Sequence, residues 1–522
     1  ARVERLVVAS CCYRVNQVSA GKSMIKLTRL WGREQGRSVP DRSDLPTRRS
    51  LLCGAAGIIG AAAVPSGAAE GEEVGPVIDK LSSYMSAAGG RAVPPFVEEQ
   101  TKNHILDTLA AMISGSELPP GRQALRFART VGGEKIATIV GTDILSGAIE
   151  AAIVNGTLAQ ADETDDNYSA GGAHPGCAVV PATLAMGELL GIDGAHFLRA
   201  VTLGYDVGMR AMKTILATTV LQDTHNVVGT FGAAAAAGCV ANLSTQQMRW
   251  LLDYAAQQAG AGFAVWQRDT AHMEKAFMFG AIGARNGVTA ALLIQAGFTG
   301  VSDVFSGRDN FFAAYAPKAD PIGLIDEIGE RYEITETIIK KWSTGGPIQS
   351  PLDALINLRQ RHPFEASQIK QVVVRLSTSA APKVDNSQSP DLCLQYLVAV
   401  MLLDGTLSFR AAHDTARMQN PTVLALRAKV QVVAEEELER LLPKRVAVVE
   451  ITLNDGTRLS ERNDTVRGSP ENPMSRDEVV AKARDLIDPV LGAGACAKLA
   501  GKVYSLEQVK SVRELRPLLQ RG

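Results

Sequence analysis

The sequence predicts a mainly α-helical protein, with a large all-helical domain and a smaller α+β lid domain. Three observations support this fold class. From residue 146 to about residue 297, apolar residues recur at helical spacing with few breaks. Ala and Gly are abundant while aromatic residues make up only 5% of the chain, which favours close contacts between helices. After about Tyr332, two stretches alternate polar and apolar residues, as β-strands do.

The length and the changes in pattern divide the chain into four parts. A chain of 522 residues exceeds the size of a single hydrophobic core, so more than one domain is expected. We predict a leader over residues 1–69, a helical domain over 70–334 and the lid over 335–470. Residues 471–522 are predicted to form helices that pack back on the helical domain.

Residues 1–69 resemble an export signal of the twin-arginine type. Arg48 and Arg49 precede an uncharged apolar stretch over residues 53–64, and small residues follow it. Such a segment is removed from reasoning about the fold. The apolar stretch is shorter than the roughly 20 residues of a permanent membrane anchor. We therefore expect a periplasmic or otherwise exported protein without a permanent anchor, with a cytoplasmic protein as the alternative.

The helical domain is predicted from apolar spacing, Pro near helix starts and Gly near helix ends. The segment over residues 227–240 carries small residues all round, so this helix must be buried among others. A strand-like run covers residues 135–141. The predicted helices cover residues 76–90, 94–114, 121–131, 146–162, 178–190, 195–213, 227–240, 244–261 and 276–296.

The lid is predicted from one alternating run and one hairpin. The alternating run covers residues 369–377, and the hairpin joins residues 445–453 to 457–460 through the turn Asn454-Asp455-Gly456. Helices are expected over residues 351–360, 391–403, 408–416 and 434–441, and two C-terminal helices over 475–491 and 506–519.

Charge and cysteine usage exclude some functions. Residues 1–69 carry 11 Lys and Arg against 4 Asp and Glu, whereas the rest of the chain carries 43 against 51. A mildly acidic body with no basic stripe argues against a nucleic-acid partner. Four widely spaced cysteines, with no CxxC pair, predict small buried apolar side chains instead of a disulfide framework or a zinc site; these are Cys177, Cys239, Cys393 and Cys496.

A run of acids is the strongest functional signal. Asp162, Glu163, Asp165 and Asp166 place four carboxylates within five residues, with no Lys or Arg beside them and an apolar segment before them. Like charges held close raise the pKa of at least one carboxyl, and such groups exchange protons near neutral pH. The alternative is an acidic helix end whose charges point to water.

Four basic side chains are candidate partners of the acid run. His174 precedes a proline, so it is expected in a loop, where a His beside carboxylates can act as acid and base. His225 begins the small-residue helix, where free N–H groups suit an anion, although Asp223 or Thr224 could simply cap that helix. Lys275 and Lys341 would hold carboxylates or stabilise an enolate-like intermediate, with surface positions as the alternative.

The acid run also resembles the magnesium–diphosphate motif of terpenoid synthases, since carboxylate oxygens suit Mg²⁺. Those enzymes need a second metal motif on a helix. The nearest candidate, Asn463-Asp464, follows a hairpin and has Arg467 where a hydroxyl ligand is wanted. We therefore expect no metal.

Taken together, these segments resemble the MmgE/PrpD family from about residue 77 to residue 519. Four blocks carry the resemblance: Asn155-Gly156-Thr157 through Asp166 to His174-Pro175; His225 with residues 229–238; Glu274-Lys275 through Gly280 to residues 297–300; and Gln395-Tyr396 through Asp404-Gly405. The resemblance implies a helical domain, an α+β lid, a cleft between them and a homodimer. It also implies proton abstraction next to a carboxylate of a small polycarboxylic acid, with no cofactor.

The resemblance further implies roles for individual residues. Glu163 stands where related decarboxylases have an active-site Asp, and Asn167 stands where they have Thr. His174 and His225 match two active-site histidines, Lys275 and Lys341 match two substrate-binding lysines, and Tyr396 matches a lid tyrosine. The predicted catalytic residues are Glu163, Asp165, Asp166, His174 and Tyr396, and the predicted substrate-binding residues are Asn167, His225, Lys275 and Lys341.

The expected function is a cofactor-independent lyase, of dehydratase or decarboxylase type, acting on a small polycarboxylate. The alternatives are an isomerase or epimerase of a similar acid, and a polycarboxylate-binding protein without catalysis. The altered positions Gln160, where a His is usual, and Asn167, where a Thr is usual, motivate the last one. Glu274-Lys275 in place of Lys-Arg, and the lack of a His after Lys341, depart from the pattern of members with known substrates.

Overall fold

A computed structural model of the chain describes residues 74–131, 133–168, 173–216, 223–260, 264–269 and 271–521. The segment predicted to be an export signal, residues 1–69, lies outside these residues. Export therefore stays a prediction.

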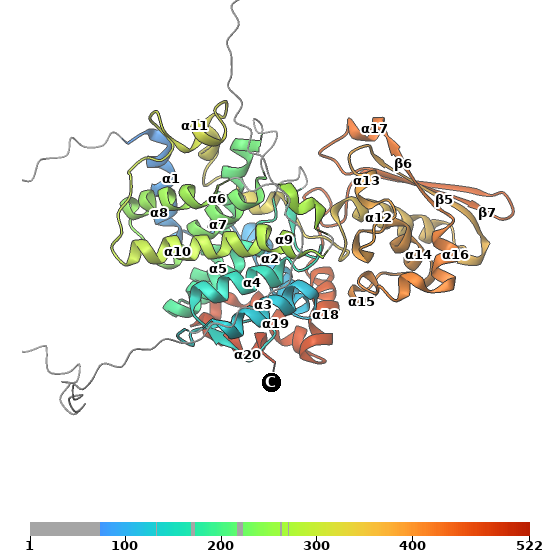
Figure 1. The fold of residues 1–522 in the computed structure, drawn as a ribbon, viewed down its shortest axis with the longest axis horizontal. Coiled ribbons are helices and arrows are strands. Elements are labelled where there is room, and N and C mark those ends of the chain that lie inside the picture. The colour runs from blue at the N-terminus through green and yellow to red at the C-terminus, as the bar shows by residue number, and fades with distance from the viewer. Residues whose placement is uncertain are drawn as a thin grey trace, which may run out of the picture. The chain divides into compact units, whose positions relative to one another are not determined.

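The first large group of elements is helical (Figure 1). Its helices are α1 (Pro76–Ala87), α2 (Pro95–Gly115), α3 (Pro119–Thr130), α4 (Ala148–Ala159), α5 (Gly176–Leu190), α6 (Gly194–Leu216), α7 (His225–Val240), α8 (Thr245–Gln258), α9 (Met273–Ala276), α10 (Ile282–Gln295) and α11 (Phe311–Tyr315). Two short antiparallel pairs accompany them: β1 (Ala137–Thr138) with β2 (Leu145–Ser146), and β3 (Asn167–Tyr168) with β4 (Thr337–Ile338).

Glycines let these helices touch backbone to backbone. A Cβ on Gly156 of α4 would lie 2.7 Å from the carbonyl oxygen of Gly280, and one on Gly232 of α7 would lie 2.7 Å from that of Gly204 in α6. Only a residue without a side chain fits such contacts. Residues 226–240 of α7 are all buried, as the small-residue pattern predicts.

A π-helical turn, Phe277–Ala281, joins α9 to α10. The continuous helical stretch Met273–Gln295 is the one described segment long and apolar enough to cross a membrane. However, 61% of its most apolar window is buried within the fold, where it packs on α4 and α7. It is therefore a core helix of the helical group.

The second group contains a four-stranded sheet in the order β6-β5-β7-β8. Strands β5 (Ile369–Ser377) and β6 (Val430–Glu435) are parallel, and β7 (Ala447–Leu453) pairs antiparallel with β5 and with β8 (Arg458–Asn463). The predicted hairpin is confirmed, with Gly456 at φ 92° in its turn. The helices are α12 (Gly346–Arg361), α13 (Ala381–Val384), α14 (Leu394–Asp404), α15 (Phe409–Ala412), α16 (Pro421–Arg427) and α17 (Glu436–Glu439).

One lid element differs from its prediction. Residues 434–441 are predicted to be helical, but the chain is extended through Glu435 as β6 and only the four residues of α17 form a helix. Pairing with β5 along six residues satisfies the backbone groups of this edge strand. That tertiary pairing outweighs the helical preference of the glutamates.

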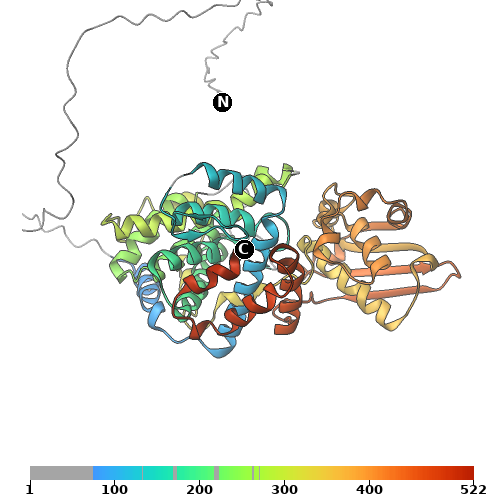
Figure 2. The same cartoon turned by 90° about the horizontal axis from the view of Figure 1, so that it is seen from below.

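The C-terminal helices α18 (Arg476–Leu491), α19 (Ala495–Tyr504) and α20 (Arg516–Leu519) return to the helical group. Helices α18 and α19 pack on α2, and Figure 2 shows them in red beside the blue N-terminal helices. Buried apolar residues form two large clusters, one in the helical group with these returning helices and one in the lid. The predicted fold class is confirmed, and the four cysteines of the body are buried and free.

Candidate active site

The acid run lies in a buried loop, residues 160–167, which we call the acid loop. It follows α4 and leads into β3, whose Asn167 pairs with Ile338 of β4. Asp165 and Asp166 are 0% exposed and Glu163 is 5% exposed. The alternative of an acidic helix end with charges in water is therefore wrong, and each carboxylate needs a partner inside the protein.

Glu163 is neutralised by two lysines from distant segments. The Lys275 ammonium, in α9, donates a hydrogen bond to Glu163 Oε1. Lys340 Nζ donates to the Glu163 carbonyl oxygen at 2.7 Å and lies 3.8 Å from Oε2. Burial alone would raise the pKa of Glu163, but Lys275, Lys340 and His272 together hold that pKa well below its usual range. Glu163 is thus ionised in this arrangement.

Asp165 forms a pair with His174. The His174 Nδ1 atom lies 3.1 Å and 3.0 Å from the two Asp165 carboxylate oxygens. Burial, Asp166 and Glu163 together raise the pKa of Asp165 to about 7, against the opposing charge of Lys340, which lies 3.5 Å away. Burial, Lys340 and His225 lower the pKa of His174 well below its usual value. The pair can therefore exchange one proton near neutral pH.

Asp166 has a structural role in holding the loop. It accepts hydrogen bonds from Tyr205 of α6 at 2.6 Å and from the Gly176 N–H at 3.1 Å, and His104 Nδ1 of α2 lies 2.7 Å away. Burial would raise its pKa, but His104, Tyr205 and Gly176 lower it. Both of its carboxylate oxygens are engaged by these anchors, so Asp166 fixes the loop beside Asp165.

Asp162 connects the acid loop to the lid. His413, just after α15, has Nε2 2.8 Å from Asp162 Oδ2 and donates from Nδ1 to the Phe409 carbonyl at 2.8 Å. The contact with Asp162 is an ion pair by distance, since Nε2 makes no hydrogen bond to a described residue in this geometry. Burial opposes the charge on His413, but the Asp162 carboxylate raises the pKa of His413 to about 9. The lid is thus held to the acid loop by an ion pair at neutral pH.

His225 lies beside His174 at the first residue of α7. Their ring centroids are 5.6 Å apart, and the His225 ring stacks on Phe279 at 3.5 Å. Asp223 accepts hydrogen bonds from both the backbone N–H and Nδ1 of His225. Asp223 therefore binds the backbone at the start of α7, as a capping residue would, and the same carboxylate also orients the His225 imidazole beside His174.

His272 is a site residue that our sequence reasoning missed. Its backbone has φ 60°, a left-handed conformation that is strained for a residue other than glycine. Its Nδ1 lies 4.0 Å from Glu163 Oε1. Its buried Nε2 has no hydrogen-bond partner among the described residues. Strain and an unsatisfied polar atom next to Glu163 are typical of a binding site.

Two predicted site residues are not brought to the acid loop. Lys341 directs its Nζ over the ring of Trp342, 4.7 Å from the centroid, and the adjacent Lys340 contacts the acids instead. The two adjacent side chains thus have different partners, and Lys340 is the one that faces the loop. Tyr396 is buried within the lid core, where its hydroxyl donates to the Ala411 carbonyl at 2.6 Å. Neither the Lys341 ammonium nor the Tyr396 hydroxyl contacts the acid loop among the described residues.

The remaining predicted residues converge. Glu163, Asp165, Asp166, His174, His225 and Lys275 lie in one connected network, and Asn167 is buried at the end of the acid loop. Of the seven histidines in the chain, five lie in or next to this network. This scarcity of His was the signal that could have identified His104, His272 and His413. No group of three or more His, Cys, Asp or Glu in the described ranges is arranged to hold a metal ion.

The raised pKa of Asp165 predicts a pH dependence of stability. An acid with a raised pKa in the folded state binds more protons there than in the unfolded state between about pH 4 and pH 7. Its stabilising contribution is therefore present at low pH and is lost as pH rises through about 7. We expect the Tm of the unsubstituted protein to fall between pH 5 and pH 8 by roughly 2 °C more than that of Asp165→Asn.

The measurement is thermal unfolding of both proteins across that pH range. Asp309→Asn is the matched control, since Asp309 is 81% exposed and pairs only with exposed Arg308 among the described residues. Equal slopes for all three proteins would contradict the protonation of Asp165 near neutral pH.

Comparison with known proteins identifies the family. The MmgE/PrpD N-terminal domain matches residues 79–322, and the MmgE/PrpD C-terminal domain matches residues 342–506. The chain belongs to the MmgE/PrpD family. The predicted resemblance is confirmed, and the two matched domains cover the helical group and the lid.

Several curated MmgE/PrpD relatives carry an activity in their names. The chain is 27% identical over 464 residues to the cis-aconitate decarboxylase of Homo sapiens, covering 84% of this chain and 94% of the relative. It is 25% identical to the cis-aconitate decarboxylase-like protein oryM of Aspergillus oryzae, covering 85% and 97%. It is 24% identical to the cis-aconitate decarboxylase of Aspergillus terreus, covering 85% and 96%. These matches support an enzyme of the lyase type.

Proposed function

We propose that the chain is a lyase that acts on a small polycarboxylic acid by proton transfer next to a carboxylate, with no cofactor. Loss of CO₂ from an unsaturated tricarboxylate such as cis-aconitate is the first candidate reaction, because the relatives bear that activity in their names. The observation that carries the proposal is the buried His174–Asp165 pair beside Lys275 and Lys340. The homodimer implied by the family stays a prediction.

The cations would bind and polarise the acid. Lys275 and Lys340 both lie at the Glu163 carboxylate, which supports an anion-binding role for their ammonium groups. A substrate carboxylate arriving next to them would share these charges. Buried cations in a place with little water stabilise developing negative charge more strongly than exposed ones.

In a decarboxylation, the C–C bond to the departing carboxylate breaks and CO₂ leaves. The electron pair of that bond moves onto carbons conjugated with a second carboxylate, where Lys275 or Lys340 stabilises it. A proton from the His174–Asp165 pair then adds to the carbon, and the pair is reloaded from solvent. In a dehydration, the same pair would first take the proton next to a carboxylate and then protonate the leaving hydroxide.

The test is turnover by the purified chain, followed by proton NMR with separate detection of CO₂. The acids to supply are cis-aconitate, 2-methylcitrate, citrate and tricarballylate, a saturated tricarboxylate. We expect one of the first three to be consumed with release of CO₂ or water. Isomerised acid without release would favour an isomerase, and tight binding of every acid without turnover would favour the non-catalytic binding protein.

A further inference from the structure

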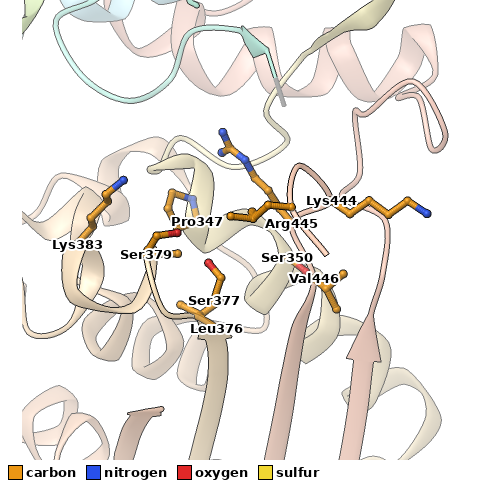
Figure 3. Close-up of a pocket in the computed structure, with 11 residues that line it drawn as sticks. Pro347, Ser350, Leu376, Ser377, Ser379, Lys383, Lys444, Arg445 and Val446 are labelled. Carbon is orange, nitrogen blue, oxygen red and sulfur yellow. The ribbon is translucent and has the colours of Figure 1, made fainter. Parts of the chain in front are cut away.

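A second group of positive charges lies in the lid, outside the acid loop. It surrounds a cavity of about 180 Å³ between the start of α12, the end of β5 and the segment before β7 (Figure 3). The described side chains that line it include three cations and three serines but no carboxylate: Lys383, Lys444, Arg445, Ser350, Ser377 and Ser379. Glu439 lies at the rim, where it accepts from the Ser379 N–H and hydroxyl at 2.9 Å each. This lining suits an anion.

Among the residues that line the cavity, Arg445 interacts electrostatically with the acid loop. Its side chain is partly buried, and burial lowers the pKa of its guanidinium while the Glu163 carboxylate raises it. In Figure 3 the guanidinium points away from Leu376 and Ser377, which line the far side of the cavity. The lining residue that interacts electrostatically with Glu163 is therefore the one with a planar, bidentate head group.

Gly346 makes room for this guanidinium. A Cβ at Gly346, the first residue of α12, would overlap the Arg445 Nη1 atom. Gly346 is only six positions after Lys340, which contacts Glu163 and Asp165. The same stretch of chain thus supplies a lysine to the acid loop and the space for Arg445.

We propose that Arg445 and this cavity bind a carboxylate of the substrate that is remote from the reacting carbon. This inference rests on the proposed function for the identity of the anion. A tricarboxylate has three carboxylates. Lys275 and Lys340 lie together at Glu163, so they can bind carboxylates only near the reacting carbon. An arginine binds a carboxylate through two parallel N–H donors, so it fixes the orientation of the molecule as well as its charge.

The test is binding of a probe that needs no turnover. Tricarballylate and succinate are titrated into the full chain by calorimetry, with Arg445→Gln, Arg445→Lys and Gly346→Ala compared with the unsubstituted protein. We expect Arg445→Gln and Gly346→Ala to lower the affinity for tricarballylate about tenfold or more. Arg445→Lys should lose less affinity than Arg445→Gln. The affinity for succinate, which lacks the third carboxylate, is expected to change less than twofold in the same variants. Arg458→Gln in β8, an exposed lid arginine, is the matched control and should change nothing.

The outcomes separate this inference from the proposed function. With an identified substrate, Arg445→Gln should raise KM about tenfold and leave kcat within about threefold, because the lost contact is made equally in the ground and transition states. Unchanged tricarballylate binding by Arg445→Gln, in an enzyme that turns over its substrate, overturns the inference alone. Weakened binding without turnover by the unsubstituted protein supports the subsite and rejects the lyase. Inorganic phosphate binding more tightly than tricarballylate at Arg445 would also overturn the inference.

Discussion

Replacing His174 with glutamine is expected to lower kcat by about 10²–10⁴-fold, the usual contribution of a positioned acid–base group. Glutamine can still face the Asp165 carboxylate, which lies 3.0 Å from His174 Nδ1, so the loop should keep its packing. The proton that the pair exchanges would be lost. The measurement is single-turnover and steady-state kinetics with the substrate found by NMR.

His362→Gln is the control for this variant, because His362 is exposed in the lid away from the acid loop. It should keep full activity, and both variants should unfold at similar temperatures. A His174→Gln enzyme with unchanged kcat would remove the pair from the mechanism, leaving Lys275 and Lys340 as a binding site only.

Replacing Lys340 with methionine is expected to affect both stability and activity. Lys340 is 0% exposed, and it provides the charge between Glu163 and Asp165 as well as a hydrogen bond to the Glu163 carbonyl. Removing one partner from a buried ion pair costs about 3 kcal/mol or more. Because Lys340 holds the pKa of Asp165 down, its loss should move that pKa above about 7 and shift the pH–rate profile to higher pH. Chemical unfolding and kcat measured against pH test both expectations.

The neighbouring lysine is a matched control. Lys341→Met removes the same atoms one residue away, where the ammonium lies over Trp342. This contact is worth about 1 kcal/mol at most in an accessible position. A larger effect from Lys341→Met than from Lys340→Met would contradict the geometry and return Lys341 to the site.

The sequence supported the fold class because helical periodicity and the Asn454-Asp455-Gly456 turn are local signals. It did not predict β6, because this strand forms by pairing with β5, far away in the chain, and residues 430–435 carry no alternating pattern of a strand. The acid run was visible for the same reason as the hairpin: its four carboxylates are adjacent in the chain.

The partners of the acid run were harder to predict. Local pattern could not decide between Lys340 and Lys341, because the direction of each side chain depends on the pairing of β4 with β3. His104 and His413 contact the loop from α2 and from the lid, 62 and about 250 positions away, so no spacing marks them. Tyr396 shows the converse: a position matched to a family pattern whose hydroxyl is used inside the lid core.

The direct backbone contact between Gly156 and Gly280 limits how the sequence beside the acid loop can change. The acid loop begins four residues after Gly156, and Lys275 lies five residues before Gly280. A larger residue at either glycine would push α4 away from the segment that bears Lys275, because its Cβ would meet backbone atoms. At Gly346 in the lid, by contrast, a Cβ would meet the end of the flexible Arg445 side chain, so the lid accepts a change there more easily.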